Sequence, residues 1–239
     1  MGCLEDLVSV LEICGLTYRY PDGRFALSGV DLSVEEGETV GVIGANGSGK
    51  TTLLLHLNGI LRGEGIIRIL GMDPGGRDRA AVRAAVGVLF QNPDDQLFCP
   101  TVREDAEFGP LNLGVSPAEA GSRAEESLAR VGLAGFGDRS PHHMSAGEKK
   151  RAALAAILAM RPRIIALDEP SADLDPRARR ELVPLLASFG GTRIVASHDL
   201  DLVRKLCGRV VLLNSGKVVA DGPAARILDN AVLLEANGL

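Results

Sequence analysis

The sequence predicts an α/β fold in which a mainly parallel sheet carries helices on both faces. Three observations lead to this prediction. Short apolar strands alternate with helical patterns from Ile164 onward. A glycine-rich loop, residues 44–52, lies between an apolar strand and a helix. Helical spacing dominates from Thr101 to Met160, so this stretch is expected to be inserted into the sheet domain.

Alternating apolar residues and turn residues predict the elements of the N-terminal part. Two strands flank the turn sequence PDGR, residues 21–24, and are expected to form an antiparallel β region. A third strand runs into the glycine-rich loop, and the following helix begins near Gly49 and ends at Asn58 and Gly59. Strands are expected at 11–20, 27–34, 38–43, 66–70 and 86–90.

Helices are predicted in the middle of the chain by the amphipathic stretch 117–133 and by the Ala/Leu-rich stretch 147–160. Later strands, at 164–168, 193–197 and 210–213, alternate with helices after Pro176 and His198. We therefore expect a single domain over residues 1–239, with a core at 1–91 and 161–239 and a helical subdomain at about 92–160.

The bulk properties exclude several classes of protein. The chain has 239 residues, of which 46% are apolar, so it can bury a substantial core. A formal charge of −5, no Trp and no basic tract argue against a nucleic-acid partner. The cysteines, Cys3, Cys14, Cys99 and Cys207, form no CxxC pair, so neither a zinc site nor a disulfide framework is expected. Free thiols fit a reducing cytosol.

Location is predicted from the N-terminus and the apolar runs. Glu5 and Asp6 stand where a signal peptide would have basic residues. The longest apolar run, Ala152 to Met160, is too short to span a membrane. We expect a soluble chain that reaches a membrane only through a partner.

The loop GANGSGKTT, residues 44–52, matches the phosphate-binding pattern G-x-x-x-x-G-K-[ST] in the required strand–loop–helix context. Its glycines let backbone amides close around phosphate oxygens, and the helix N-terminus adds positive dipole character. Lys50 would reach the β- and γ-phosphates of ATP, and the Thr51 hydroxyl would bind Mg²⁺. A dinucleotide fingerprint fits less well, because Thr52 stands in place of its third glycine.

A second motif, RIIALDEP at residues 163–170, places two carboxylates after an apolar strand. Ligands bind at this end of the strands in open α/β sheets. Asp168 could hold Mg²⁺, and Glu169 could orient and polarise the attacking water. His198 follows the strand TRIVAS and is expected to approach the γ-phosphate. A lone acidic pair after a strand would more often be a solvated loop, and an isolated histidine there is usually a surface or core residue.

In this order the motifs resemble those of ABC-transporter ATPase subunits over nearly the whole chain, which implies the P-loop NTPase cassette fold. Gln91 stands at the Q-loop position, MSAGE at 144–148 where the family has LSGGQ, and SADLD at 171–175 at the D-loop. The resemblance implies ATP contacts from Tyr20, which would stack on adenine, and from Gly44, Asn46, Gly47, Ser48, Gly49, Lys50, Thr51, Thr52, Ser145, Gly147 and Asp175. It implies Mg²⁺ ligands Thr51, Gln91 and Asp168, and catalysis by Glu169, His198 and Gln91.

The MSAGE segment departs from the family pattern at Met144, Ala146 and Glu148. Ser145 and Gly147 are kept, and these are expected to contact the γ-phosphate through a hydroxyl and a backbone amide. The methyl group of Ala146 puts the fine geometry of that contact in doubt. In the family this segment serves the ATP of a second cassette, so the resemblance implies a dimer, with itself or with a different ATPase.

The segments FQNPDDQLF (90–98), TVREDAEFGPLNLG (101–114) and HHMSAGEKKR (142–151) resemble the ATPases of energy-coupling factor (ECF) transporters. The resemblance implies that Asp94 and Asp95 face basic residues on a transmembrane coupling subunit. A solvated acidic face is the alternative. Glu104 and Asp105 are expected to cap or support the helix.

Three further features have simple interpretations. His142 and His143 are expected to be structural, because no third ligand is spaced to complete a metal site. Cys99 is expected to be a small packed residue. The cations of Lys149–Arg151 are expected to be the solvated start of a helix.

The leading hypothesis is an ATP-hydrolysing subunit of an ECF-type importer, peripheral at the cytoplasmic face of the membrane. Cobalt or nickel is favoured as cargo, because the chain is short after the turn at 214–217. Vitamin import is the close alternative. A soluble ABC ATPase of translation or DNA repair fits less well, since the chain has neither two cassettes nor a coiled-coil insertion. Glu169 and His198 argue against a regulator that does not hydrolyse ATP.

Overall fold

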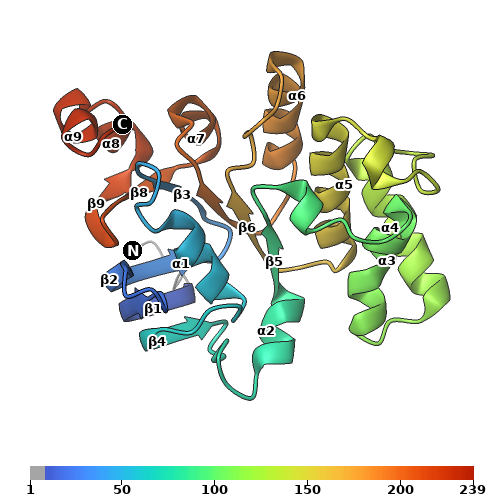
Figure 1. Ribbon diagram of the computed structural model, residues 1–239, viewed down its shortest axis with the longest axis horizontal. Coiled ribbons are helices and arrows are strands. Elements are labelled where there is room, and N and C mark those ends of the chain that lie inside the picture. The colour runs from blue at the N-terminus through green and yellow to red at the C-terminus, as the bar shows by residue number, and fades with distance from the viewer. Residues whose placement is uncertain (1–8) are drawn as a thin grey trace, which may run out of the picture.

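A computed structural model describes residues 9–239. The expectation for Glu5 and Asp6, and the thiol of Cys3, lie outside the described residues. Two sheets form the framework, and a group of helices lies at one end (Figure 1). No helix among residues 9–239 has the length and the apolar character needed to cross a membrane.

The larger sheet has six strands in the order β5-β6-β7-β3-β8-β9. Its strands are β3 (Thr39–Ile43), β5 (Val86–Leu89), β6 (Ile164–Asp168), β7 (Thr192–Ala196), β8 (Arg209–Asn214) and β9 (Lys217–Pro223). All pairs are parallel except β8 with β9. The mainly parallel sheet is therefore as predicted, and the carboxyl ends of β3, β6 and β7 meet at one edge.

Both faces of this sheet are covered. Ile164 and Ala166 of β6 pack into a core with helix α1 (Lys50–Leu57) and the N-terminal strands. Ile165 and Leu167 point the other way, into a core with the helices that follow. Because side chains alternate across a strand, a strand buried on both faces reads as a continuous apolar run, as β6 does from Ile164 to Leu167 before it ends at Asp168.

The smaller sheet is antiparallel, with the order β2-β1-β4, and confirms the expected N-terminal β region. Its strands are β1 (Ser9–Arg19), β2 (Phe25–Glu35) and β4 (Glu64–Ile69). It lies beside α1 in the lower left of Figure 1. The turn after β1 places Tyr20 close to the start of α1, where its hydroxyl lies 2.9 Å from Thr52 Oγ1.

The helical group comprises α3 (Val102–Asn112), α4 (Pro117–Arg130) and α5 (Ala146–Ala159). It lies to the right of β5 in Figure 1, with α5 nearest the sheet. A Cβ atom at Gly87 of β5 would clash with the Ile157 side chain of α5. Glycine at this position therefore permits close contact between α5 and the edge of the sheet.

The remaining helices are α2 (Arg79–Ala85), α6 (Pro176–Ala187), α7 (Leu200–Leu206), α8 (Ala224–Leu228) and α9 (Ala231–Ala236), with 3₁₀ turns η1 (Pro93–Asp95) and η2 (Pro141–His143). The sequence predicted neither α2 nor β9. Helix α2 buries only Val82, so it lacks a wide apolar stripe. Strand β9 has no fully buried residue, so its alternation of apolar and polar residues is weak.

Candidate nucleotide site

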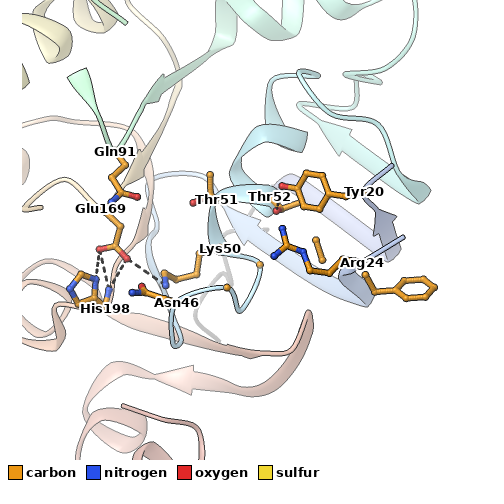
Figure 2. Close-up of a pocket in the computed structure, with 13 residues that line it drawn as sticks. Tyr20, Arg24, Asn46, Lys50, Thr51, Thr52, Gln91, Glu169 and His198 are labelled. Carbon is orange, nitrogen blue, oxygen red and sulfur yellow. Dashed lines mark hydrogen bonds and ion pairs between the residues drawn. The ribbon is translucent and has the colours of Figure 1, made fainter. Parts of the chain in front are cut away.

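A cleft opens at the carboxyl ends of the central strands (Figure 2). It brings together segments that are far apart in the sequence: the loop after β1, the glycine-rich loop, the segment after β5, and the ends of β6 and β7. The lining residues are Tyr20, Arg24, Phe25, Ala26, Asn46, Gly47, Gly49, Lys50, Thr51, Thr52, Gln91, Glu169 and His198.

The glycine-rich loop has a backbone that only glycine accepts without strain. Gly44, Gly47 and Gly49 have φ values of 153°, 80° and 110°. A Cβ atom at Gly44 would clash with the carbonyl oxygen of Leu213. Gly44 and Ser48 are buried within the loop, and Asn46 is exposed at the cleft. The loop thus leaves open backbone at the N-terminus of α1, which suits phosphate oxygens.

Lys50 lies at the base of the loop and is almost completely buried. Its ammonium donates to the carbonyl oxygen of Gly44 at 2.8 Å and lies 3.4 Å from Glu169 Oε1. The cation is therefore held between the loop and the end of β6. From this position it can exchange a carbonyl contact for a phosphate oxygen.

Glu169 is the most constrained carboxylate of the cleft. Its backbone has a left-handed φ of 43°, which costs energy for a residue other than glycine. Its carboxylate accepts from Ser197 Oγ at 3.0 Å and from the backbone N–H of His198. His198 Nδ1 lies 2.9 Å from Oε2. Contacts from two segments, the start of α1 and the end of β7, hold this carboxylate in the cleft, and Figure 2 shows those to Lys50 and His198.

Asp168, one residue earlier, is 4% exposed, and its Oδ1 has no hydrogen-bond partner. Burial raises the pKa of this carboxyl, and a hydrogen bond from Thr51 opposes the rise. An orphaned carboxylate oxygen beside a hydroxyl is a donor set that suits Mg²⁺. These two residues therefore fit a magnesium ion beside the phosphates.

The end of the cleft beside Tyr20 contains two residues that the sequence did not predict, Arg24 and Phe25. The guanidinium of Arg24 lies 5.5 Å from the centre of the Tyr20 ring, and the exposed ring of Phe25 also lines the cleft. Both residues come directly after the PDG turn, only a few positions after Tyr20. This short separation along the chain was the only sequence signal that they belong to the cleft. Together they offer a cation and a second aromatic face beside Tyr20.

Five predicted contact residues do not line this cleft. Gly44 and Ser48 are buried within the glycine-rich loop beside it, whereas Ser145, Gly147 and Asp175 lie on other segments. Ser145 is the N-cap of α5, and Glu148 completes a capping box with it. Asp175 caps α6 by accepting from the backbone N–H groups of Arg177 and Ala178. Both cap residues are exposed, so their polar groups face outward from the chain that carries the cleft.

The segment after β5 is held mainly by α5. Gln91 lines the cleft, and Asp94 forms an ion pair with Lys149 of α5 at 2.7 Å. Asp95 is exposed. Asp105 is buried and accepts from the backbone N–H groups of Phe98 and Cys99, while Thr101 Oγ1 accepts from Glu104 N. Asp105 thus supports the loop before α3, whereas the side chain that caps the helix is that of Thr101.

The prediction of a solvated cationic helix start was wrong for Lys150. This side chain is 1% exposed, because α5 packs it against the segment at Gln91. Lys149 and Arg151 are partly exposed and pair with Asp94 and Glu181. A run of charges along a helix points in several directions, so one member can face the interior.

The histidine pair at residues 142–143 and Cys99 differ in how far their side chains are buried. His142 and His143 lie exposed on η2, so a structural packing role is not supported. Within residues 9–239 no group of three or more His, Cys, Asp or Glu side chains could hold a metal ion. Cys99 is partly buried, and desolvation raises the pKa of its thiol to about 11. A thiol with so high a pKa is poorly reactive.

Comparisons with known proteins agree with this geometry. A family model described as ABC transporter matches residues 27–172. The energy-coupling factor transporter ATP-binding protein EcfA of Methanothermobacter thermautotrophicus is 47% identical over 236 residues, covering 96% of this chain and 76% of that protein.

Two solved structures are also similar. The first is cbiO1 of Clostridium perfringens, described as part of the ABC transporter complex cbiONQ. It has a TM-score of 0.82 and 34% identity, covering 95% of this chain and 94% of that chain. The second is the cassette MJ0796, a dimer in a post-hydrolysis state bound to ADP and Pi. It has a TM-score of 0.80 and 28% identity, covering 90% and 98%.

The expected fold class is thereby confirmed as the ABC ATPase cassette, a mainly parallel sheet with an antiparallel N-terminal sheet and helices. The phosphate loop, the carboxylates after β6 and the histidine after β7 lie around one cleft. The chain therefore belongs to the ABC transporter family, as an ATP-binding subunit that hydrolyses ATP.

Proposed function

We propose that the protein is the ATPase of an ECF-type importer, with a transition-metal ion, cobalt or nickel, as first candidate cargo and a vitamin as the alternative. The importer type is supported by the likeness to EcfA and to cbiO1, which extends over nearly the whole chain. The resemblance of residues 90–98, 101–114 and 142–151 to the ECF group also supports the importer type, whereas the cargo is a property of the whole complex and is decided by the uptake experiment below.

The observation that carries the hydrolytic role is the position of Glu169 in the cleft. Its carboxylate lies 3.4 Å from the Lys50 ammonium and 2.9 Å from His198 Nδ1. We assign to Glu169 the polarisation of the attacking water, because a carboxylate fixed from several sides can orient a water without reorganising. Lys50 would bind the β- and γ-phosphates, and His198 would sense the γ-phosphate. Tyr20 would stack on adenine.

A magnesium ion would be held by Thr51, Asp168 and Gln91. The unpaired Asp168 Oδ1 supports this assignment. The ion would neutralise negative charge on the phosphates during hydrolysis. Binding of a cation would also compensate the burial of the Asp168 carboxylate.

The remaining ATP contacts are proposed to act on the nucleotide of a second cassette. Ser145, Gly147 and Asp175 lie outside this chain's own cleft, and their side chains or backbone groups are accessible. The dimeric state of MJ0796 supports this arrangement. A Cβ atom at Gly147 would lie 3.0 Å from Ala178 Cβ, so glycine keeps the N-terminus of α5 close to α6.

The membrane partner is proposed to dock beside Asp94 and Asp95. An apolar groove lies between the sheet edge and the helical group. It is lined by Gln96, the residue after Asp95, and by Phe98, Phe108 and Met160. Phe98 is 64% exposed, which is unusual for a large apolar side chain beside a groove. An amphipathic cytoplasmic segment of a transmembrane subunit, with basic residues near the two aspartates, fits this surface. The ATPase would then be peripheral, at the cytoplasmic face.

The test is affinity purification of the tagged full chain from detergent-solubilised host membranes, with mass spectrometry of the proteins retained. A transmembrane subunit, with reduced retention for Phe98→Ser, is the expected result. The exposed residue Val232 on α9 gives a matched control as Val232→Ser. Recovery of no membrane protein would contradict the importer assignment.

An uptake assay, read together with the composition of the purified complex, separates the two cargo classes. Uptake of radioactive cobalt and nickel, and of vitamins, is then measured in cells that lack the ATPase. Metal uptake that returns with the wild-type chain supports the first cargo. Return of vitamin uptake alone, with a vitamin-binding subunit in the complex, would replace it by the alternative.

A further inference from the structure

Lys150 is a buried cation to which none of the sequence motifs assigns a role. It lies on α5, five residues after Ser145, and only 1% of its surface is exposed. Its ammonium donates a hydrogen bond of 2.5 Å to the backbone carbonyl oxygen of Gln91. The bond joins α5 to the residue that lines the nucleotide cleft from the end of β5.

The surroundings of Lys150 explain why a charge is tolerated there. Burial lowers the pKa of the ammonium, and the negative charges of Asp173, Asp168 and Glu169 oppose this shift. A buried charge is costly unless it is paired and hydrogen-bonded, so an apolar side chain would be the simpler choice for packing alone. The ammonium therefore serves a contact that an apolar side chain cannot make.

The segment that follows β5 needs external support. Gln91 is exposed and lies between the last strand residue, Leu89, and the short turn η1. A second contact from the same segment also ends on α5, because Gln96 Nε2 donates to the carbonyl oxygen of Ala153 at 3.2 Å. Lys150 thus fixes the beginning of the segment, and Gln96 fixes its end.

We infer that Lys150 is a positioning residue for ATP hydrolysis. By holding the Gln91 carbonyl oxygen, it sets the backbone from which the Gln91 side chain enters the cleft. This inference rests on the proposed role of Gln91 at the metal and the attacking water. Loss of the bond would let the Gln91 backbone shift, and a displacement of about 1 Å at a reacting group can cost about 100-fold in rate.

The experiment compares Lys150→Met with wild type in the purified full chain. We expect kcat for ATP hydrolysis to fall about 10- to 100-fold. The KM for ATP should change less than about threefold, because Lys150 does not line the cleft. Lys150→Gln keeps a donor without the charge and should recover part of kcat. The control is Arg151→Met on the same helix, which removes a partly exposed ion pair with Glu181.

A double-substitution cycle with Gln91→Ala separates positioning from a general structural role. If Lys150 acts through Gln91, Lys150→Met should cause no further loss of kcat in the Gln91→Ala background. Equal losses in both backgrounds would overturn the inference, and so would wild-type kcat in a folded Lys150→Met. If Lys150→Met does not fold, Lys150→Gln is used in the same cycle with the same criteria. Wild-type activity of Gln91→Ala alone would refute the proposed role of Gln91 and remove the basis of the inference.

Discussion

The nucleotide cleft and the outward face formed by the N-termini of α5 and α6 differ in how their polar groups are satisfied. In the cleft, the Glu169 carboxylate contacts Lys50, Ser197 and His198, which come from distant parts of the chain. On the outward face, Ser145 and Asp175 bond only within their own helix caps, at Glu148, Arg177 and Ala178.

This difference indicates which part of the machinery is complete in one chain. The cleft is held by long-range contacts, so a single chain is expected to bind nucleotide. The outward face has local bonds that a ligand could replace without disturbing the core. It therefore suits a contact that forms and breaks with a second cassette during each cycle.

The largest expected effect is from Glu169→Gln, which removes the charge and keeps the shape. Without the carboxylate, the attacking water loses its proton acceptor, and kcat should fall by about 10²- to 10⁴-fold. Binding of ATP should persist, since Lys50 and the loop are intact. Phosphate release and size-exclusion chromatography with ATP would measure hydrolysis and ATP-stabilised dimers. Glu181→Gln on α6 is the exposed control, and unchanged hydrolysis in Glu169→Gln would refute the assignment.

The second prediction tests whether the outward face acts on another chain. Lys50→Ala and Ser145→Ala should each reduce ATP hydrolysis by about 100-fold, as loss of a single oxyanion-type donor does. Mixing the two variants should restore hydrolysis, because the mixed dimer has one site with both residues intact. The phosphate-release assay is run on each variant alone and on the mixture. A mixture as inactive as its components would show that Ser145 acts within its own chain.

The third prediction concerns the magnesium site inside the cleft. Asp168→Asn keeps a neutral oxygen but removes the charge, and should raise the Mg²⁺ concentration for half-maximal hydrolysis by about 10- to 100-fold. Titration of activity with Mg²⁺ at saturating ATP measures the shift. Asp138→Asn, at an exposed ion pair with Arg103, is the control. An unchanged midpoint for Asp168→Asn would place the ion elsewhere.

The smallest expected effect concerns the reactivity of two cysteine thiols, the buried Cys207 and the exposed Cys14. Burial raises the pKa of Cys207 to about 12, so its thiol stays protonated and unreactive through pH 9. Cys14 is exposed on β1. Alkylation with iodoacetamide at pH 8, followed by mass spectrometry, should modify Cys14 before Cys207. Comparable labelling of Cys207 in the native protein would mean that the packing of α7 on β3 opens readily.

Much of the cleft could be predicted because its motifs are local. The spacing of Gly44, Gly49 and Lys50 defines a phosphate loop by itself, and an apolar strand before Asp168 and Glu169 indicates the edge where ligands bind. Arg24 and Phe25 were missed, because their place beside Tyr20 depends on how the turn folds back toward α1. No local pattern encodes that approach.

The sequence by itself determined the alternating elements, the phosphate loop and the order of the motifs, since these depend on short spacings along the chain. Only the tertiary structure decided that Lys150 is buried against Gln91, 59 residues away, and that Asp94 pairs with Lys149. It also decided that Ser145 and Asp175 lie outside the cleft that Glu169 borders. The physical reason is that the direction of a side chain on a helix is set by what the helix packs against, and a charge pattern does not specify that neighbour.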